Sequence, residues 1–247
     1  MLNLANPTVF LGVARKLLPW LAGLTLALFV VGLTLGFNAP PDYQQGETVK
    51  IMYLHVPAAW LSTFIYGVMT LAALATLVWR HPLADAAQKA AAPLGAGFTF
   101  ICLVTGSLWG KPMWGTYWVW DARLTSVLVL FIIYLGLVAL WRSIEEPARA
   151  ARAAAILTLV GAVDLPIIKF SVDWWNTLHQ PASVFRMGGP TIATAMLWAL
   201  LVMALAFTSL FGTLHLMGIR NEILRRRLRR LSILAASEAE TGAPVEA

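Results

Sequence analysis

The segment LTSVLVLFIIYLGLVALW, residues 124–141, runs for eighteen consecutive positions without a charged residue. At a rise of about 1.5 Å per residue, an α-helix of this length spans about 27 Å, close to the ~30 Å hydrocarbon core of a bilayer. Five further apolar runs have comparable lengths, at about residues 17–37, 57–79, 93–109, 153–170 and 191–217. The sequence therefore predicts an all-α integral membrane protein whose six transmembrane helices form a single domain over residues 1–247.

The composition supports this prediction. Hydrophobic residues make up 59% of the chain and charged residues only 12%, about half the charged share of a soluble domain. The first run follows Arg15 and Lys16 but is too long for the apolar part of a signal peptide, so we expect a retained anchor. Residues 218–247 are expected to form a basic cytoplasmic tail that becomes disordered from Ser237.

The positive charges indicate the orientation. With the N-terminus inside, thirteen of the 18 lysines and arginines fall on the inner side and five on the outer side, which the positive-inside rule favours. We therefore expect both termini in the cytoplasm. The net charge of +6 comes largely from the arginines of residues 225–230. That cluster follows the last span directly, so its expected partner is the anionic lipid surface, and no nucleic acid is expected.

The histidines divide between the two sides. In this topology His55 and His179 lie at the outer surface, whereas His81 and His215 lie on the inner side and are expected to be structural. Neutral imidazole is a good axial ligand for haem iron, and two ligands from separate segments can hold a porphyrin from opposite faces. From spacing alone, this hypothesis and an interfacial role are about equally favoured. The only cysteine, Cys102, excludes an internal disulfide, and the chain contains no CxxCH motif for covalent haem.

Tryptophans are concentrated on the outer side. Six of the 11 lie in or beside two outer connections, namely Trp109, Trp114, Trp118, Trp120, Trp174 and Trp175. Anchoring at the membrane interface explains scattered tryptophans, but the density around residues 114–120 exceeds what anchoring needs. A flat aromatic surface suits a large planar apolar ligand.

If this tryptophan-rich connection is a short helix lying on the membrane, its residues fall into two stripes. Helical spacing would give one stripe comprising Trp114, Trp118, Asp121 and Thr125. A second stripe would comprise Tyr117, Trp120 and Leu124. One stripe would face lipid and the other would form the aromatic surface.

Polar residues beside this connection have candidate roles. Arg123 or Lys111 could pair with the carboxylates of a ligand. Asp121 could orient an indole N–H or a backbone amide, or it could cap the helix that follows. The two roles of Asp121 are equally favoured.

Two other classes of membrane protein compete with a haem-holding role. Electron transfer of the cytochrome b kind needs paired histidines within the spans, and only His215 lies there. A permease is suggested by Asp164, because an acid inside a span is a functional candidate. A local ion pair with Lys169, five residues on, is the more favoured explanation of Asp164.

The segment WGTYWVWD at 114–121 resembles the tryptophan-rich WWD signature of proteins that handle haem in cytochrome c biogenesis. Its neighbours resemble the CcmC family, haem exporter protein C of the multi-component maturation system. These are MYLHVPAAW at 52–60, GSLWGKPMW at 106–114 and LPIIKFSVDWWNTLH at 165–179. The resemblance covers residues 51–180, with Tyr117 where much of the family has tryptophan.

The resemblance implies a specific role. It implies transient, non-covalent binding of haem b at the periplasmic face of a bacterial inner membrane, with His55 and His179 as axial ligands of the iron. It implies delivery to the chaperone CcmE, with the ABC transporter subunits CcmA and CcmB and the small protein CcmD as partners, and no enzyme activity. The candidate haem-contacting residues are His55, His179, Trp114, Gly115, Trp118, Trp120, Asp121, Arg123, Trp174 and Trp175.

Overall fold

The computed structural model describes residues 5–181, 183–184 and 186–241. Helices account for most of this part of the chain, and six of the segments are long and apolar enough to cross a membrane, which confirms the predicted fold class. In chain order, the elements are α1 Pro7–Asn38, η1 Glu47–Ile51, α2 Met52–Val78, α3 Ala84–Trp114, α4 Ala122–Ser143, α5 Pro147–Gly161, α6 Asp164–Trp174 and α7 Thr194–Thr241.

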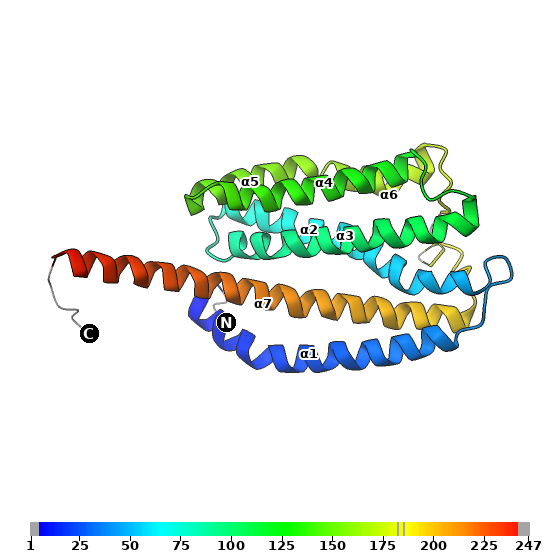
Figure 1. Ribbon diagram of the computed structural model, residues 1–247, viewed down its shortest axis with the longest axis horizontal. Helices are drawn as coiled ribbons and strands as arrows, with labels where there is room; N and C mark the ends of the chain where they lie inside the picture. Colours follow the sequence, from blue (N-terminus) through cyan, green and yellow to red (C-terminus); the bar gives the residue numbers. More distant parts are fainter. Residues whose placement is uncertain (1–4, 182, 185, 242–247) are drawn as a thin grey trace.

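The helices form three layers that run along one axis (Figure 1). One outer layer contains α1 and α7, the central layer contains α2 and α3, and the other outer layer contains α4 with α5 and α6. The central pair packs on both sides, because α2 contacts α5 and α7 while α3 contacts α4 and α7. The outer connections predicted from sequence gather at one end of this bundle, at the right of Figure 1.

Most helices are longer than the apolar runs that predicted them. Capping residues and prolines outside those runs set where α1 and α5 begin. Asn6 accepts a hydrogen bond from the Thr8 amide at the start of α1, and Pro7 occupies the first helical position. Glu146 caps α5 in the same way, also followed by proline. A side-chain oxygen at this position satisfies backbone amides that have no partner within the helix.

The fifth span is divided into α5 and α6 by a break at residues 162–163. Asp164 follows the break and is only 8% exposed, and its Oδ2 atom has no hydrogen-bond partner among the described residues. The predicted ion pair with Lys169 is therefore wrong. With 3.6 residues per turn, a position five residues along a helix lies about 140° around the axis, and Lys169 is exposed while Asp164 is buried.

Two buried tyrosines connect the central layer to the α4–α6 layer. The ring of Tyr134 in α4 lies beside Gly95 of α3, and its hydroxyl donates a hydrogen bond to the Ser62 carbonyl at 2.8 Å. The hydroxyl of Tyr66 in α2 donates to the Thr158 carbonyl of α5 at 3.1 Å. The two rings meet edge to face at a centroid distance of 5.2 Å. Both buried hydroxyls thereby find acceptors inside the bundle, where an unpaired donor would be unfavourable.

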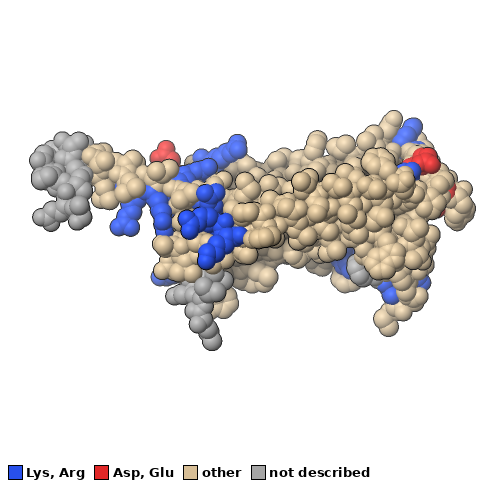
Figure 2. Space-filling model, turned by 90° about the horizontal axis from the view of Figure 1, so that it is seen from below, with Lys and Arg blue, Asp and Glu red and all other residues tan. Residues whose placement is uncertain are grey.

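Charged residues are segregated along the bundle axis. Lysines and arginines gather around the end that carries the N-terminus and the tail of α7, at the left of Figure 2, and the middle of the bundle is largely free of them. Lys89 of α3 and Arg226 of α7 both contact Glu222 at 3.0 Å in this region.

The basic tail continues the last helix. Helix α7 runs through Thr241, past the Ser237 at which the sequence predicts disorder, and residues 242–247 lie outside the described part of the chain. Alanine and glutamate dominate this segment, and their high helix propensity favours continuation of α7.

Gly95→Ala is expected to destabilise the bundle by about 1–3 kcal/mol, the usual range for overpacking a core. A Cβ atom at residue 95 would overlap the ring of Tyr134, whose hydroxyl is fixed by Ser62. Gly97→Ala on the same helix is the control, because a Cβ atom there meets no other atom within 4 Å. Thermal unfolding in detergent measures both variants, and equal melting temperatures would contradict the proposed contact.

Candidate functional site

His55 lies in the first turn of α2 and faces α3. Its Nδ1 atom is 3.1 Å from the Cys102 carbonyl oxygen and 3.1 Å from the Thr105 hydroxyl. A carbonyl oxygen can only accept a hydrogen bond, so Nδ1 carries the proton and Nε2 keeps its lone pair. The ring lies against Gly106, where a Cβ atom would come within 2.9 Å of it. This is the arrangement that fixes an imidazole for ligation of a metal through Nε2.

His179 lies in the connection between α6 and α7 and has a similar arrangement. Its Nδ1 atom is 3.0 Å from the Gln180 carbonyl oxygen, so Nε2 is again the atom with a free lone pair. Burial lowers the pKa of His179, and the nearby charge of Arg123 lowers it further, while the Gln180 carbonyl and Asp121 act in the opposite direction. The lowered pKa favours the neutral imidazole, the form that binds a metal.

The fold brings the two histidines to the same end of the bundle. They are close enough to interact electrostatically, and each contacts a tryptophan from the last turns of α3. His55 meets Trp109 edge to face at 5.7 Å between ring centroids, and His179 lies 6.4 Å from Trp114. Neither Nε2 atom forms a hydrogen bond within the described part of the chain. Each histidine therefore combines an unengaged ring nitrogen with a tryptophan neighbour.

The tryptophan-rich connection does not form the short helix that its spacing allowed. Trp114 is the last residue of α3, and Gly115 ends this helix in the left-handed conformation with φ 74°. Residues 116–121 form bends and extended chain until α4 begins at Ala122. The stripes expected from helical spacing are consequently absent from this connection. Glycine at the end of a helix commonly adopts this conformation and stops it.

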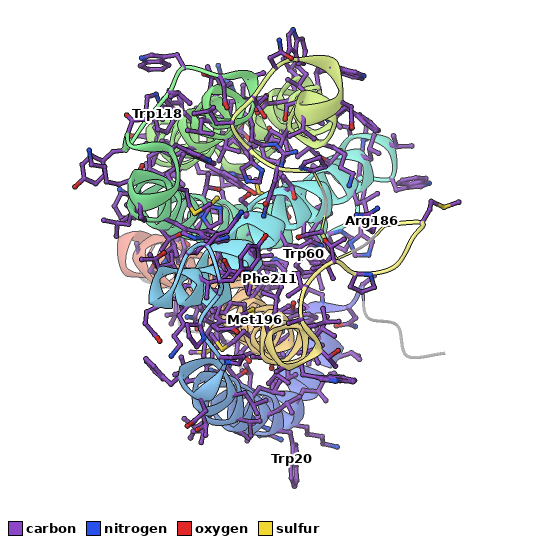
Figure 3. The ribbon with its side chains drawn as sticks, turned by 90° about the vertical axis from the view of Figure 1, so that its right-hand side faces the viewer. Trp20, Trp60, Trp118, Arg186, Met196 and Phe211 are labelled. Atoms are coloured by element: carbon purple, nitrogen blue, oxygen red, sulfur yellow. The ribbon has the colours of Figure 1, made fainter. Side chains whose placement is uncertain are left out.

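Trp118 and Trp120 contact each other within this connection. Their rings meet edge to face at 5.5 Å, and Trp120 is 77% exposed. The indole Nε1 of Trp118 is buried and has no hydrogen-bond partner among the described residues. A buried donor without a partner is unfavourable, so this N–H is available to an acceptor on a bound ligand. Figure 3 views the bundle from this end, with Trp118 beside the connection between α3 and α4.

Trp174 and Trp175 form a second aromatic group at the end of α6. Phe170 stacks on Trp174 at 5.3 Å, and the two tryptophan rings meet at 5.6 Å. Both indoles are about half exposed. No ring contact within the described residues joins this group to Trp114 or Trp118, so it forms a separate aromatic cluster.

Asp121 performs both of the roles that the sequence left open. Its Oδ1 atom accepts a hydrogen bond from the Leu124 amide at 2.8 Å and caps α4. Its Oδ2 atom accepts one from the Leu178 amide at 3.3 Å. The same carboxylate therefore starts α4 and holds the segment that carries His179.

The two candidate cations differ in their availability. Arg123 donates a hydrogen bond from Nε to the Ser171 hydroxyl at 2.7 Å, which leaves its terminal nitrogens free to bind a carboxylate. Lys111 donates to the Gly115 carbonyl at 2.9 Å and lies over the ring of Tyr117 at 5.2 Å. Arg123 is therefore better placed than Lys111 to bind an anionic group beside His179.

Sequence reasoning missed the residues that hold His55. The Cys102 carbonyl, Thr105 and Gly106 all come from α3, about fifty positions away in the chain. Gln45 was also missed; its Oε1 atom accepts a hydrogen bond from Trp109 Nε1 at 2.8 Å. Gly106 was the only sequence signal for this contact, because a small residue in a membrane helix permits close approach of a second helix.

The inner histidines have local partners. His215 Nε2 is 2.8 Å from the Ala87 carbonyl oxygen, and its ring stacks on Phe211 at 5.1 Å. His81 Nδ1 accepts a hydrogen bond from the Leu83 amide at 3.3 Å. These contacts agree with the structural roles predicted for both residues.

These features define a polytopic helical membrane protein with a paired-histidine, tryptophan-rich site at one end of its bundle. The model of the family described as CcmC, heme exporter protein C, matches residues 1–234. The chain therefore belongs to the heme exporter protein C family, which confirms the resemblance seen in its sequence.

Individual relatives support this assignment over nearly the whole chain. Heme exporter protein C of Bradyrhizobium diazoefficiens is 68% identical over 237 residues, covering 96% of this chain and 90% of the relative. The protein of the same name from Escherichia coli K12 is 49% identical over 230 residues, 92% of each chain. A ccmC-like mitochondrial protein of Marchantia polymorpha, named for cytochrome c biosynthesis, is 47% identical over 78% of this chain and 82% of its own.

Asp121→Ala is expected to cost about 1 kcal/mol through loss of the cap and to release the segment around Leu178. Glu146→Ala is a matched control, because Glu146 caps α5 in the same way at the other end of the bundle. Hydrogen exchange measures the difference: residues 175–180 should exchange faster only in the Asp121 variant. Equal protection of this segment in both variants would show that the Leu178 contact is unimportant.

Proposed function

We propose that this chain holds haem at the outer face of the bacterial inner membrane and delivers it for cytochrome c maturation. The observation that carries the proposal is the pair of imidazoles, His55 and His179, each bound through Nδ1 to a backbone carbonyl and each with an unengaged Nε2. Imidazole nitrogens of this kind are axial ligands of haem iron. The family name, heme exporter protein C, supports the same cargo.

The surroundings of the two histidines suit haem b. Trp109 and Trp114 lie beside the imidazoles and offer aromatic surface for the porphyrin. The free Nε1 of Trp118 and the terminal nitrogens of Arg123 are donors suited to the propionates. The only cysteine, Cys102, is buried within α3, and the chain has no CxxCH motif for covalent haem, so the proposed binding is non-covalent and reversible.

Delivery explains why the site is open at one end of the bundle. Trp120 is strongly exposed and contacts the partly buried Trp118, so a partner that docks on Trp120 reaches the haem site directly. The proposed partner is the haem chaperone CcmE. The ABC transporter subunits CcmA and CcmB and the small protein CcmD complete the assembly. The chain itself makes and breaks no covalent bond and is not an enzyme in this proposal.

The concentration of basic residues at the opposite end supports the proposed orientation. Those residues lie with both termini (Figures 1 and 2), and basic residues favour the cytoplasmic side. The histidine site is then periplasmic. Cysteines introduced singly at residues 120 and 229 would test this, because an impermeant thiol reagent added to intact spheroplasts should label only residue 120.

His55→Ala and His179→Ala should each lower the haem content of the purified protein by roughly tenfold or more, on the scale of losing a metal contact, and remove the low-spin signal of six-coordinate iron. His81→Ala is the control, because His81 lies at the opposite end of the bundle. Absorption spectroscopy and a pyridine haemochrome assay give the measurement. If both outer variants keep wild-type haem and a low-spin spectrum, the ligand assignment is wrong.

Trp120→Ala should reduce capture of haem-loaded protein by the purified chaperone while leaving the haem content unchanged. Its indole is exposed and does not contact either histidine ring. Trp20→Ala matches it in exposure, 79% against 77%, and projects from a different part of the molecule (Figure 3). Equal chaperone binding by the two variants would contradict a docking role for the tryptophan-rich connection.

A further inference from the structure

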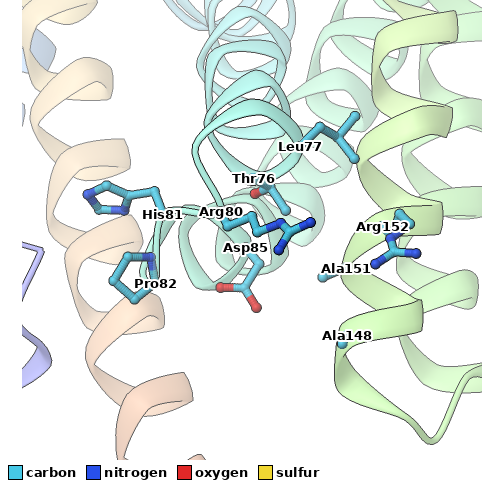
Figure 4. Close-up of a pocket in the computed structure, with 9 residues that line it drawn as sticks. All are labelled: Thr76, Leu77, Arg80, His81, Pro82, Asp85, Ala148, Ala151 and Arg152. Carbon is cyan, nitrogen blue, oxygen red and sulfur yellow. The ribbon is translucent and has the colours of Figure 1, made fainter.

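A concave site lies at the end of the bundle opposite the two histidines, where α2 turns into α3 beside the start of α5. The cavity measures about 460 Å³. Its walls are Thr76, Leu77, Arg80, His81, Pro82, Asp85, Ala148, Ala151 and Arg152 (Figure 4). Nothing in the proposed haem relay uses this cavity.

Two arginines lie on opposite walls of the cavity (Figure 4). Arg80 follows the end of α2 and extends toward α5, which carries Arg152. Neither forms a salt bridge among the described side chains. Like charges on opposite walls of a cavity repel, and an anion between them removes this repulsion.

The one acid in the wall is already engaged. Asp85 Oδ2 is 2.9 Å from Nη1 of Arg226 in α7, and Oδ1 accepts a hydrogen bond from the Ala86 amide at 2.8 Å. Its charge is therefore balanced from outside the cavity. His81 Nδ1 is likewise occupied by the Leu83 amide. The cavity consequently keeps an excess of positive charge.

The backbone at Arg80 is a second, independent observation. Arg80 has φ 49°, the only positive φ at a non-glycine residue in the described chain. Helices that end in this conformation usually place glycine there, because a side chain is disfavoured by about 1 kcal/mol or more. Unfavourable backbone geometry of this kind is often associated with function. Here it directs the Arg80 side chain toward α5 (Figure 4).

We propose that this cavity binds a phosphate group, supplied by an anionic phospholipid of the inner leaflet. Guanidinium groups bind phosphate oxygens in pairs, and basic pockets between membrane helices on the cytoplasmic side are established lipid headgroup sites. The adjoining surfaces of α2 and α5 are apolar and exposed, as Val78 at 63% and Ile156 at 52% show. They are suited to an acyl chain, which a free phosphate lacks.

The test uses the full chain in phosphatidylcholine nanodiscs. Phosphatidylglycerol is added in one arm of the experiment and inorganic phosphate in the other. The melting temperature is measured in both arms, and native mass spectrometry measures the lipid that stays bound. Wild-type protein should gain stability and retain phosphatidylglycerol, with no response to inorganic phosphate. Arg152→Gln should lower the affinity for phosphatidylglycerol by about tenfold, the usual effect of losing one charge-assisted contact. Arg149→Gln is the control, because Arg149 is an exposed arginine of the same helix that does not line the cavity.

Arg80→Gly separates binding from a structural role. Glycine is favoured at φ 49°, so this variant should melt at the same or a higher temperature than wild type in phosphatidylcholine alone. It should nevertheless lose the response to phosphatidylglycerol. If Arg152→Gln and Arg80→Gly both respond to phosphatidylglycerol as strongly as Arg149→Gln does, the proposal is overturned. A response of wild type to inorganic phosphate without one to phosphatidylglycerol would overturn the lipid as its source.

Discussion

The contact between His55 and the backbone of α3 is the interaction on which the site depends. The imidazole lies against Gly106 and donates a hydrogen bond to the Cys102 carbonyl oxygen. This contact packs α2 close to α3, and it also fixes Nδ1 as the donor, which leaves the lone pair on Nε2. A side chain at residue 106 would separate the helices and displace the ligand together, so packing within the bundle and binding at its end share one cause.

The second histidine is held by a different device. His179 lies in a connection without regular structure, and its position follows from the Asp121 carboxylate, which joins the start of α4 to the Leu178 amide. One ligand is therefore carried by a helix and the other by a loop that the Leu178–Asp121 hydrogen bond attaches to the start of α4. A ligand on a loop has more freedom to move than one on a helix, which suits a site that must release its cargo.

Hydropathy was sufficient to predict the six spans, because only long helices satisfy the backbone within lipid. The conformation of the tryptophan-rich connection was not predictable from spacing, since Gly115 ends α3 and the residues after it do not continue the helix. The partners of His55 were also missed, because they come from a distant part of the chain. The pair expected between Asp164 and Lys169 failed since the two residues face different sides of α6. The predicted topology singled out His55 and His179, the family resemblance implied their role as ligands, and the structure then supplied the hydrogen bonds that orient them.

The most direct test of the central claim is pulsed electron paramagnetic resonance of ferric haem bound to protein labelled with ¹⁵N-histidine. Hyperfine coupling counts the histidine nitrogens bonded to the iron. Ligation by His55 and His179 predicts a low-spin centre with two axial histidine nitrogens. A high-spin centre, or a low-spin centre with one or no coupled histidine, would contradict it.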